Sequence, residues 1–329
     1  MRAQDYIQAS TYVRVREKSF LTREQWERLI EAPALEEALR VLQESAYGVL
    51  LQKLDDPRDF EKALVERLEE DYEEMNRFAK DPDLIRFLRL RYDTHNEKVL
   101  LKEHFLDASL EELIMPLATA DVSAGRVMLR DADRAFSKPE HIQKAMEAYE
   151  KKRDPQALAH PLDHHYLSSL SAMADKLGSA LLKEYATLQI DYYNLLTLLR
   201  AQGRTLDLQE IDPLLVTGGH IPVETLKGLF FSSVASVLDA VKRYLPDALV
   251  QGARDAYENE QRLSALERAF DVYILGAMQE GSQITYGPEV LFNYLIQLEN
   301  EVRNLRVILV SKISSVEPAR IRERIRRHA

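Results

Sequence analysis

The sequence predicts an all-α protein built from three similar helical-bundle repeats, and three observations support this prediction. Apolar residues recur at helical spacing along most of the 329 residues, whereas runs that alternate apolar and polar residues, as strands do, are hard to find. One short pattern of leucines, an acid and an asparagine occurs three times. A proline follows each copy, where one helical unit would end and the next begin: Pro116, Pro213 and Pro318.

The repeated pattern is centred on three asparagines, each with an acid three residues earlier. The pairs are Asp93 with Asn96, Asp191 with Asn194, and Glu301 with Asn304. A leucine six residues before each asparagine and aliphatic residues four and five after it complete the pattern, and at 100° per residue these positions span roughly 140° of a helix. In a strand they would lie on both faces. We expect the acid and the amide to make one half-buried polar contact per repeat, with each other or with a neighbouring helix.

Helical spacing indicates the elements in order along the chain. Residues 21–32 begin with a capping box, Thr22 and Gln25, and residues 34–45 continue with the same periodicity. Residues 56–79 form a long acidic helix with Asp59 as its cap and an inner stripe of Phe60, Leu64, Leu68, Tyr72 and Met75. Further helices are expected over 140–152, 164–177, 224–245, 253–275 and 287–313.

A second similarity supports the repetition, because residues 20–30 resemble residues 220–230, with Leu21 matching Ile221 and Leu29 matching Leu229. A weaker middle copy is expected within residues 125–136. We therefore predict three repeats of about a hundred residues, over 1–112, 113–212 and 213–329, the last with a C-terminal closing helix. A closed ring of such units, unlike an open stack, needs no capping repeats.

Composition excludes several classes of function. The chain has no cysteine, so disulfides, thiolate metal sites and thiol nucleophiles are excluded, and this suits a reducing cytosol. Its first residues lack the apolar core of a secretory signal, and the uncharged run 228–238 is far shorter than the ~20 residues of a membrane span. A formal charge of −10 disfavours binding to nucleic acid.

Several segments resemble one known family. They are residues 12–48, 191–204 and 217–226, and most specifically the block "EVRNLRVILVSKISSVEPARIRERIRR" at 301–327. They are similar to the C subunit of V/A-type rotary ATPases, which is related to the eukaryotic d subunit. The resemblance implies a funnel of three helical domains around a pseudo-threefold axis with a central cavity. It also implies a protein without an active site, which sits on the membrane rotor ring of proteolipid subunits and receives the central stalk.

Three motifs allow a chemical interpretation that competes with a structural one. The two glycines of "TGGHIP" at 217–222 lack the lysine and preceding strand of a phosphate loop, which favours a turn between helices. His160 and His164 have the spacing of a metal-binding helix, but the intervening Pro161 and the cap-like Asp163 favour a solvated helix start. The acidic run 66–74 could bind cations or a basic partner, but such runs are usually solvated helix faces.

The C-terminal arginines form the densest positive cluster of this acidic chain. They are Arg320, Arg322, Arg324, Arg326 and Arg327. Contact with a partner or with lipid headgroups competes with pairing to the chain's own acids, which we favour. The acid and asparagine pairs could suggest acid–base catalysis, but three copies on three separate helices favour packing.

The sequence thus favours a non-catalytic adaptor, without cofactor or metal, in the central rotor of a V/A-type ATPase that transports H⁺ or Na⁺. We expect a monomer when isolated, located in the cytoplasm at the membrane-bound complex. The alternative is a generic helical scaffold or interaction protein, or a helical enzyme whose site the sequence does not reveal.

Overall fold

The computed structural model describes residues 2–131, 138–202 and 207–326, and these ranges contain helices and no strand. The all-α prediction is therefore confirmed. Contacts divide the chain into two compact units: unit 1 comprises Met1–Ile85 and Asp271–Ala329, and unit 2 comprises Arg86–Phe270. Two helices, α6 (Pro82–Leu106) and α15 (Leu263–Met278), belong partly to each unit.

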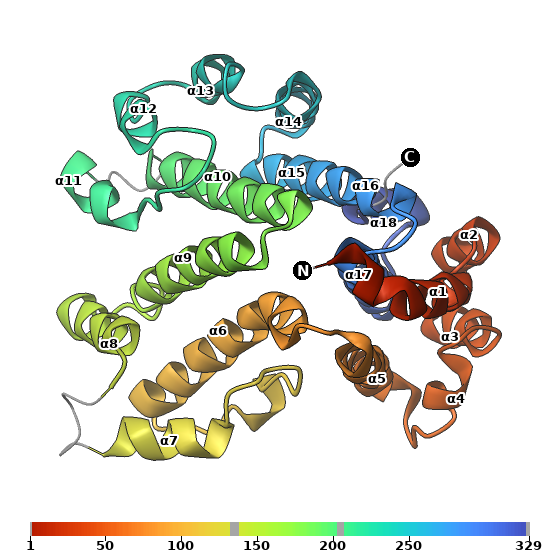
Figure 1. Ribbon diagram of the computed structural model, residues 1–329. Coiled ribbons are helices and arrows are strands. Elements are labelled where there is room, and N and C mark those ends of the chain that lie inside the picture. Colours follow the sequence, from red (N-terminus) through yellow and green to blue (C-terminus); the bar gives the residue numbers. More distant parts are fainter. Residues whose placement is uncertain (1, 132–137, 203–206, 327–329) are drawn as a thin grey trace. The chain divides into compact units, whose positions relative to one another are not determined.

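Unit 1 combines an N-terminal and a C-terminal set of helices. The N-terminal set consists of η1 (Ala3–Tyr6), α1 (Ile7–Arg16), η2 (Glu17–Ser19), α2 (Arg23–Glu31), α3 (Leu35–Gln43), α4 (Gly48–Leu51), η3 (Pro57–Asp59) and α5 (Phe60–Phe78). The C-terminal set consists of α16 (Glu280–Gln283), α17 (Pro288–Ile313) and α18 (Pro318–Arg324). Helix α17 packs against α1, α3, α5 and α18, so it forms the centre of the unit (Figure 1).

Local sequence explains how the helices of unit 1 begin and which faces they bury. The Thr22 hydroxyl accepts from the Gln25 N–H and the Gln25 side chain accepts from the Thr22 N–H, which confirms the capping box. The predicted stripe of α5 is buried from Phe60 to Met75. Asp59 precedes α5 as predicted, but its side chain makes no capping bond and pairs instead with Lys62.

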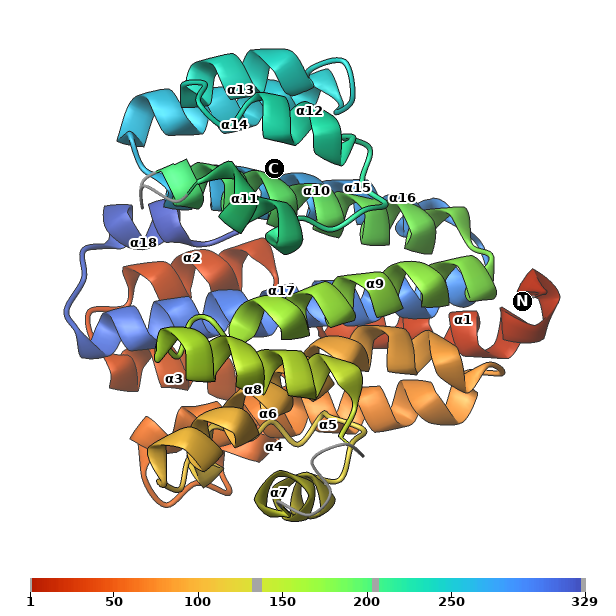
Figure 2. The ribbon, with the colours of Figure 1, turned by 90° about the vertical axis from the view of Figure 1, so that its left-hand side faces the viewer.

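Unit 2 contains the remaining helices. They are η4 (Glu111–Leu113), α7 (Val122–Arg130), α8 (Glu140–Lys152), α9 (Ala159–Leu177), α10 (Ala180–Gln202), α11 (Leu208–Ile211), η6 (Asp212–Leu214), α12 (Val223–Gly228), α13 (Val234–Val241) and α14 (Asp247–Glu260). Helix α9 packs against both α8 and α10, and the three lie side by side (Figure 2). Gly178 ends α9 with a left-handed φ of 70°, where glycine carries no Cβ penalty, and allows the immediate turn into α10.

The apolar stripe of the repeated pattern is buried in both units. Leu101, Leu198 and Ile308 are each completely inaccessible to solvent. In unit 2, Leu100 and Leu101 join a core cluster with residues of α7, α8 and α9. The periodicity of the sequence therefore predicts correctly which face of these long helices is turned inward.

Three predicted helices differ from the structure. Residues 224–245 are divided between α12 and α13, and residues 253–275 between α14 and α15. Helix α9 begins at Ala159, so His160 and Pro161 lie in its first turn, where proline is tolerated, and Asp163 does not cap it.

The middle copy of the second similarity was expected within 125–136, and residues 125–130 of that range lie in α7, which begins at Val122. Asp121 caps α7 by accepting from the backbone of Ser123 and Ala124, while residues 132–136 lie outside the described residues.

Candidate functional site

The second acid and asparagine pair lies on α10 and binds the backbone of the segment that leads to α12. Asn194 donates from Nδ2 to the Val216 carbonyl at 2.7 Å and accepts at Oδ1 from the Val216 N–H at 2.9 Å. Asp191 accepts from the N–H groups of His220 and Ile221 at 2.9 and 3.0 Å. Both side chains are fully buried. We call this arrangement junction 2.

The glycines of "TGGHIP" explain how the segment comes so close to Asp191. A Cβ on Gly219 would lie 2.3 Å from Asp191 Oδ1, and Gly218 adopts a φ of 106° that favours glycine. The segment connects η6 to α12, so the prediction of a turn between helices is confirmed. His220 also contacts Asp191, with Nδ1 at 2.8 Å from Oδ2. Burial raises the pKa of Asp191, while the two backbone N–H bonds lower it.

Junction 1 repeats the arrangement on α6. Asn96 donates to the Met115 carbonyl and accepts from the Met115 N–H, both at 2.9 Å. Asp93 accepts from the N–H groups of Thr119 and Ala120 at 2.5 and 3.0 Å. In both junctions the acid therefore binds the fourth and fifth residues after the one held by the asparagine.

Junction 3 lies on α17 and is assembled from two distant segments. Asn304 donates to the Arg326 carbonyl at 2.9 Å and accepts from the Arg326 N–H at 2.8 Å. Glu301 accepts from the Leu21 N–H at 2.8 Å, although the two residues lie 280 positions apart. The Tyr47 hydroxyl donates to the other Glu301 oxygen at 2.9 Å. Leu21 is the residue that matches Ile221 in the sequence, and Ile221 is bound by the acid of junction 2. Junction 3 therefore makes the corresponding bond, although its two bound segments are not joined by a loop.

Burial affects the acid of junction 3 most strongly. Desolvation raises the pKa of Glu301 to about 7, although the bonds from Leu21 and Tyr47 and the charge of Arg67 favour the ionised form. In junctions 2 and 3 the bonds satisfy backbone groups that are buried or partly buried, whereas Asp93 of junction 1 binds two N–H groups of exposed residues. The bonds go to connecting segments, whereas the sequence suggested bonds between the two side chains or to a neighbouring helix.

The C-terminal arginines are mostly paired within unit 1. Arg322 pairs with Glu27 at 2.9 Å and Glu31 at 2.5 Å, and Arg326 pairs with Asp271 at 2.5 Å. Arg320 pairs with the neighbouring Glu323 at 3.0 Å. Arg324 is exposed, and Arg327 lies outside the described residues. Arg322 therefore ties α18 to α2, and Arg326 ties the segment after α18 to α15.

The acidic run 66–74 is only partly a solvated face. Asp71 is fully buried and pairs with Arg16 at 2.6 Å and with Arg67 at 3.0 Å. The Tyr294 hydroxyl also donates to it at 2.6 Å. The sequence interpretation was therefore wrong for this residue, because its partners on α1 and α17 lie far away in the sequence. Removing one member of such a buried pair leaves an uncompensated charge, so the network holds α1, α5 and α17 together.

The histidines of α9 lie apart from the junction contacts. His160 Nδ1 is 3.2 Å from the Tyr193 hydroxyl, and His164 Nδ1 is 3.4 Å from the Ser168 hydroxyl. Within the described residues, no group of three or more histidines and carboxylates is arranged to hold a metal ion.

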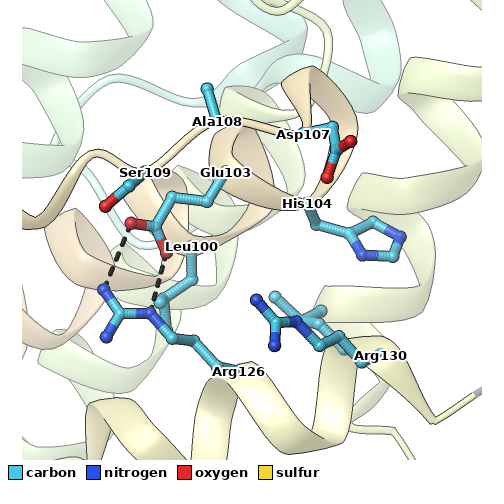
Figure 3. Close-up of a pocket in the computed structure, with 9 residues that line it drawn as sticks. Leu100, Glu103, His104, Asp107, Ala108, Ser109, Arg126 and Arg130 are labelled. Carbon is cyan, nitrogen blue, oxygen red and sulfur yellow. Dashed lines mark hydrogen bonds and ion pairs between the residues drawn. The ribbon is translucent and has the colours of Figure 1, made fainter.

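A small polar cavity of about 540 Å³ lies between the end of α6 and α7 (Figure 3). Arg126 lines this cavity and forms a bidentate ion pair with Glu103, at 2.9 and 3.1 Å, and it also pairs with Glu111. Arg130 and His104 point into the same space (Figure 3). The Arg126 guanidinium lowers the pKa of Glu103, so this carboxyl is held ionised and is unsuited to act as a general acid near neutral pH.

Sequence reasoning missed the partners that complete the junctions. Tyr47 carried no pattern of its own, His220 lay in "TGGHIP" without being given a role, and Gln202 was not singled out. The Gln202 amide donates to three carbonyls of the loop after α12, those of Leu229, Phe230 and Ser232. The position of Gln202 was a signal for this contact. It is a polar residue at the end of the apolar stripe of α10, and a buried polar side chain is expected to bind a nearby backbone group.

Comparison with known proteins identifies relatives along almost the whole chain. A family model described as ATP synthase (C/AC39) subunit matches residues 9–324. The A-type ATP synthase C subunit of Methanocaldococcus jannaschii is 24% identical, over 96% of this chain and 85% of that protein. The corresponding protein of Methanosarcina acetivorans is 27% identical, over 98% and 92%.

A bacterial relative shows the same extent of similarity. The V-type sodium ATPase C subunit of Enterococcus hirae is 22% identical, over 98% of both chains. Among the described helices, none has both the length and the apolar character that crossing a membrane requires. The match over residues 9–324 covers far more than half of the sequence and agrees with the all-helical fold. This chain belongs to the family of C subunits of V-type and A-type ATPases.

Proposed function

We propose that the chain is a non-catalytic adaptor in the central rotor of a V/A-type ATPase. It links the central stalk to the membrane ring of proteolipid subunits and transmits torque, so that ATP turnover is coupled to transport of H⁺ or Na⁺. Family membership is the observation that carries this proposal, since the matched relatives are named as C subunits of such ATPases. The isolated chain is a monomer, and in the cell it lies on the cytoplasmic side as a peripheral part of the complex.

The junctions support a mechanical role. An adaptor under torque must resist separation of its helices, and loops are the part of a protein that yields most easily. Here an acid and an asparagine on each of α6, α10 and α17 bind the backbone of a connecting segment. Backbone groups held in this way leave the connecting segments less free to move relative to the long helices.

The three junctions also support the proposed repeats, over 1–112, 113–212 and 213–329. In this arrangement the repeats surround a pseudo-threefold axis and form a funnel whose cavity receives the stalk. Partner-facing surfaces of such a socket should combine apolar anchors with charge. Arg324 is an exposed cation of the C-terminal cluster and is suited to contact a partner or lipid headgroups.

Reconstitution tests the proposal directly. Adding the purified chain to separated head and membrane sectors should restore ion transport driven by ATP, measured as ion uptake per ATP hydrolysed. Heat-denatured chain is the control for added protein. If the sectors couple equally well without this chain, the adaptor role is wrong.

The alternative, a generic helical scaffold or a helical enzyme, predicts a different result. A scaffold would bind neither the stalk nor the ring, and an enzyme would show turnover alone. The purified chain should elute as a monomer and hydrolyse no ATP, which can be measured by light scattering and phosphate release. Turnover that persists through successive purification steps would favour the enzyme.

A further inference from the structure

A wide groove in unit 2 carries four of the histidines of the chain. It has a volume of about 1450 Å³ and is lined by residues of α8, α9, α11 and η6. The four of the eight histidines that line it are His141, His160, His164 and His165. Imidazoles are the side chains that gain charge between pH 8 and 5, so the charge of this groove depends on pH.

The carboxylates of the groove are already engaged within it. Glu140 pairs with Lys144 at 2.6 Å, and Glu210 lies 3.5 Å from Lys152. Asp207 caps α11 by accepting from the Glu210 N–H at 2.8 Å, and Asp154 accepts from the Gln156 N–H at 2.9 Å. Lys151 is a third lysine of the groove and is exposed. Three lysines therefore face four carboxylates, so only protonated imidazoles can give the groove a positive charge.

Two of the histidines are stacked directly on each other. The rings of His141 and His165 are parallel, with an interplanar angle of 1° and centroids 3.7 Å apart. Glu97 of α6 lies 3.1 Å from His141 Nε2 and can neutralise one charge. Desolvation and the charge of His141 lower the pKa of His165, although Glu97 also favours a charge on that ring. An anion bound in the groove would relieve this repulsion.

Other charges near the stack are balanced among themselves. Lys98 of α6 pairs with Asp163 of α9 at 2.5 Å. His164 adds to the positive potential at His165, and on α10 the neutral Tyr193 hydroxyl contacts His160. With all four imidazoles protonated, the groove would hold seven cations against its four carboxylates and Glu97.

We propose that this groove binds an acidic segment of a partner protein and that the affinity rises as the pH falls from 7.5 to 5.5. The groove runs along α8, whose 13 residues extend about 20 Å. This length suits an extended segment of about six residues better than a single small anion. The chain carries a net charge of −10, so an acidic segment is repelled elsewhere on its surface. The proposal is independent of the rotor role.

An octa-aspartate peptide with a pH-insensitive rhodamine label provides the probe, because aspartate stays ionised at pH 5.5. Fluorescence anisotropy with the full chain, at constant ionic strength, should show a Kd at least tenfold lower at pH 5.5 than at pH 7.5. Equal affinity at both pH values would overturn the proposal. Inorganic tripolyphosphate that displaces the peptide at equal charge concentration would also overturn it, since the ligand would then be a small polyanion.

Matched variants distinguish binding in the groove from attraction by the overall charge of the protein. His164→Gln and Lys151→Gln change exposed groove residues and should each weaken binding at pH 5.5 about threefold or more. His104→Gln removes an exposed histidine outside the groove and should leave the affinity unchanged. Circular dichroism verifies that all three variants are folded. Equal losses in His104→Gln and His164→Gln would show binding through overall charge and refute the groove.

Discussion

Junction 2 and junction 3 use the same plan with different covalent connections. In junction 2 a continuous loop supplies Val216, His220 and Ile221 to α10. In junction 3 the same kinds of bonds reach Arg326 on one side and Leu21 on the other, with no short loop between them. The comparison shows that side chains on a long helix can hold a connecting segment in place whether or not the chain is continuous there.

The acids of the two junctions also differ in their bonding. Asp191 accepts two backbone N–H groups, whereas Glu301 accepts one and takes its second bond from the Tyr47 hydroxyl. Backbone N–H bonds favour the charged carboxylate, and Glu301 has fewer of them. We therefore expect junction 3 to respond to pH and to local opening more readily than junction 2.

The largest loss of stability is expected from adding a methyl group at Gly219, where the junction 2 loop approaches Asp191 most closely. In Gly219→Ala the new Cβ would collide with Asp191 Oδ1, so the loop must move and lose its bonds. We expect a loss of about 2–4 kcal/mol in unfolding free energy, measured by urea denaturation. Gly252→Ala is the control, because a Cβ there meets no atom within 4 Å. Equal effects of the two substitutions would mean that the close approach is unimportant.

Replacing the asparagine should affect the two junctions differently, because junction 2 binds one continuous loop and junction 3 binds two distant segments. Asn194→Leu leaves the buried Val216 N–H and C=O without partners and should cost about 1–3 kcal/mol in unfolding free energy. Asn304→Leu should instead increase hydrogen exchange in α18 with a smaller global loss, because Asn300 still donates to the Arg326 carbonyl and the segment can open locally. Asn259→Leu changes an exposed residue and should have little effect. A global loss in Asn304→Leu as large as in Asn194→Leu would remove the distinction.

A loss of coupling without a loss of stability would have another meaning. If Asn194→Leu keeps the wild-type melting temperature but fails to restore coupled transport in the reconstituted ATPase, the residue contacts a partner. The packing role of the asparagine would then be wrong.

The smallest effect is expected from the titration of Glu301. The native carboxyl keeps its proton to about pH 7, whereas the ordinary pKa is 4.5, so this group stabilises the fold at low pH and the contribution is lost as the pH rises from 4.5 to 7. Glu301→Gln keeps an acceptor for the Leu21 N–H and does not titrate, and its amide NH₂ faces the Tyr47 hydroxyl, which must then accept instead of donate. Its unfolding free energy should depend less on pH, by about 1 kcal/mol per pH unit between 5 and 7. Parallel stability curves for the two proteins would contradict the raised pKa.

Spacing along the chain was enough to predict long helices such as α5 and α17 and their inner faces, but not the breaks within residues 224–245 and 253–275. Burial of Leu101, Leu198 and Ile308 follows from this spacing, because each turn of a helix returns the chain to the same face. The capping box at Thr22 was equally predictable, since both of its bonds join residues three positions apart.

The partners of the polar residues, in contrast, became known only from the folded chain. The asparagines hold Met115, Val216 and Arg326, which share no side-chain chemistry, because the bonds are made to backbone groups that every such residue carries. No pattern of side chains could therefore mark these partners. The burial of Asp71 was hidden for a related reason, since its partner Arg16 lies 55 residues away and only folding brings the two charges together.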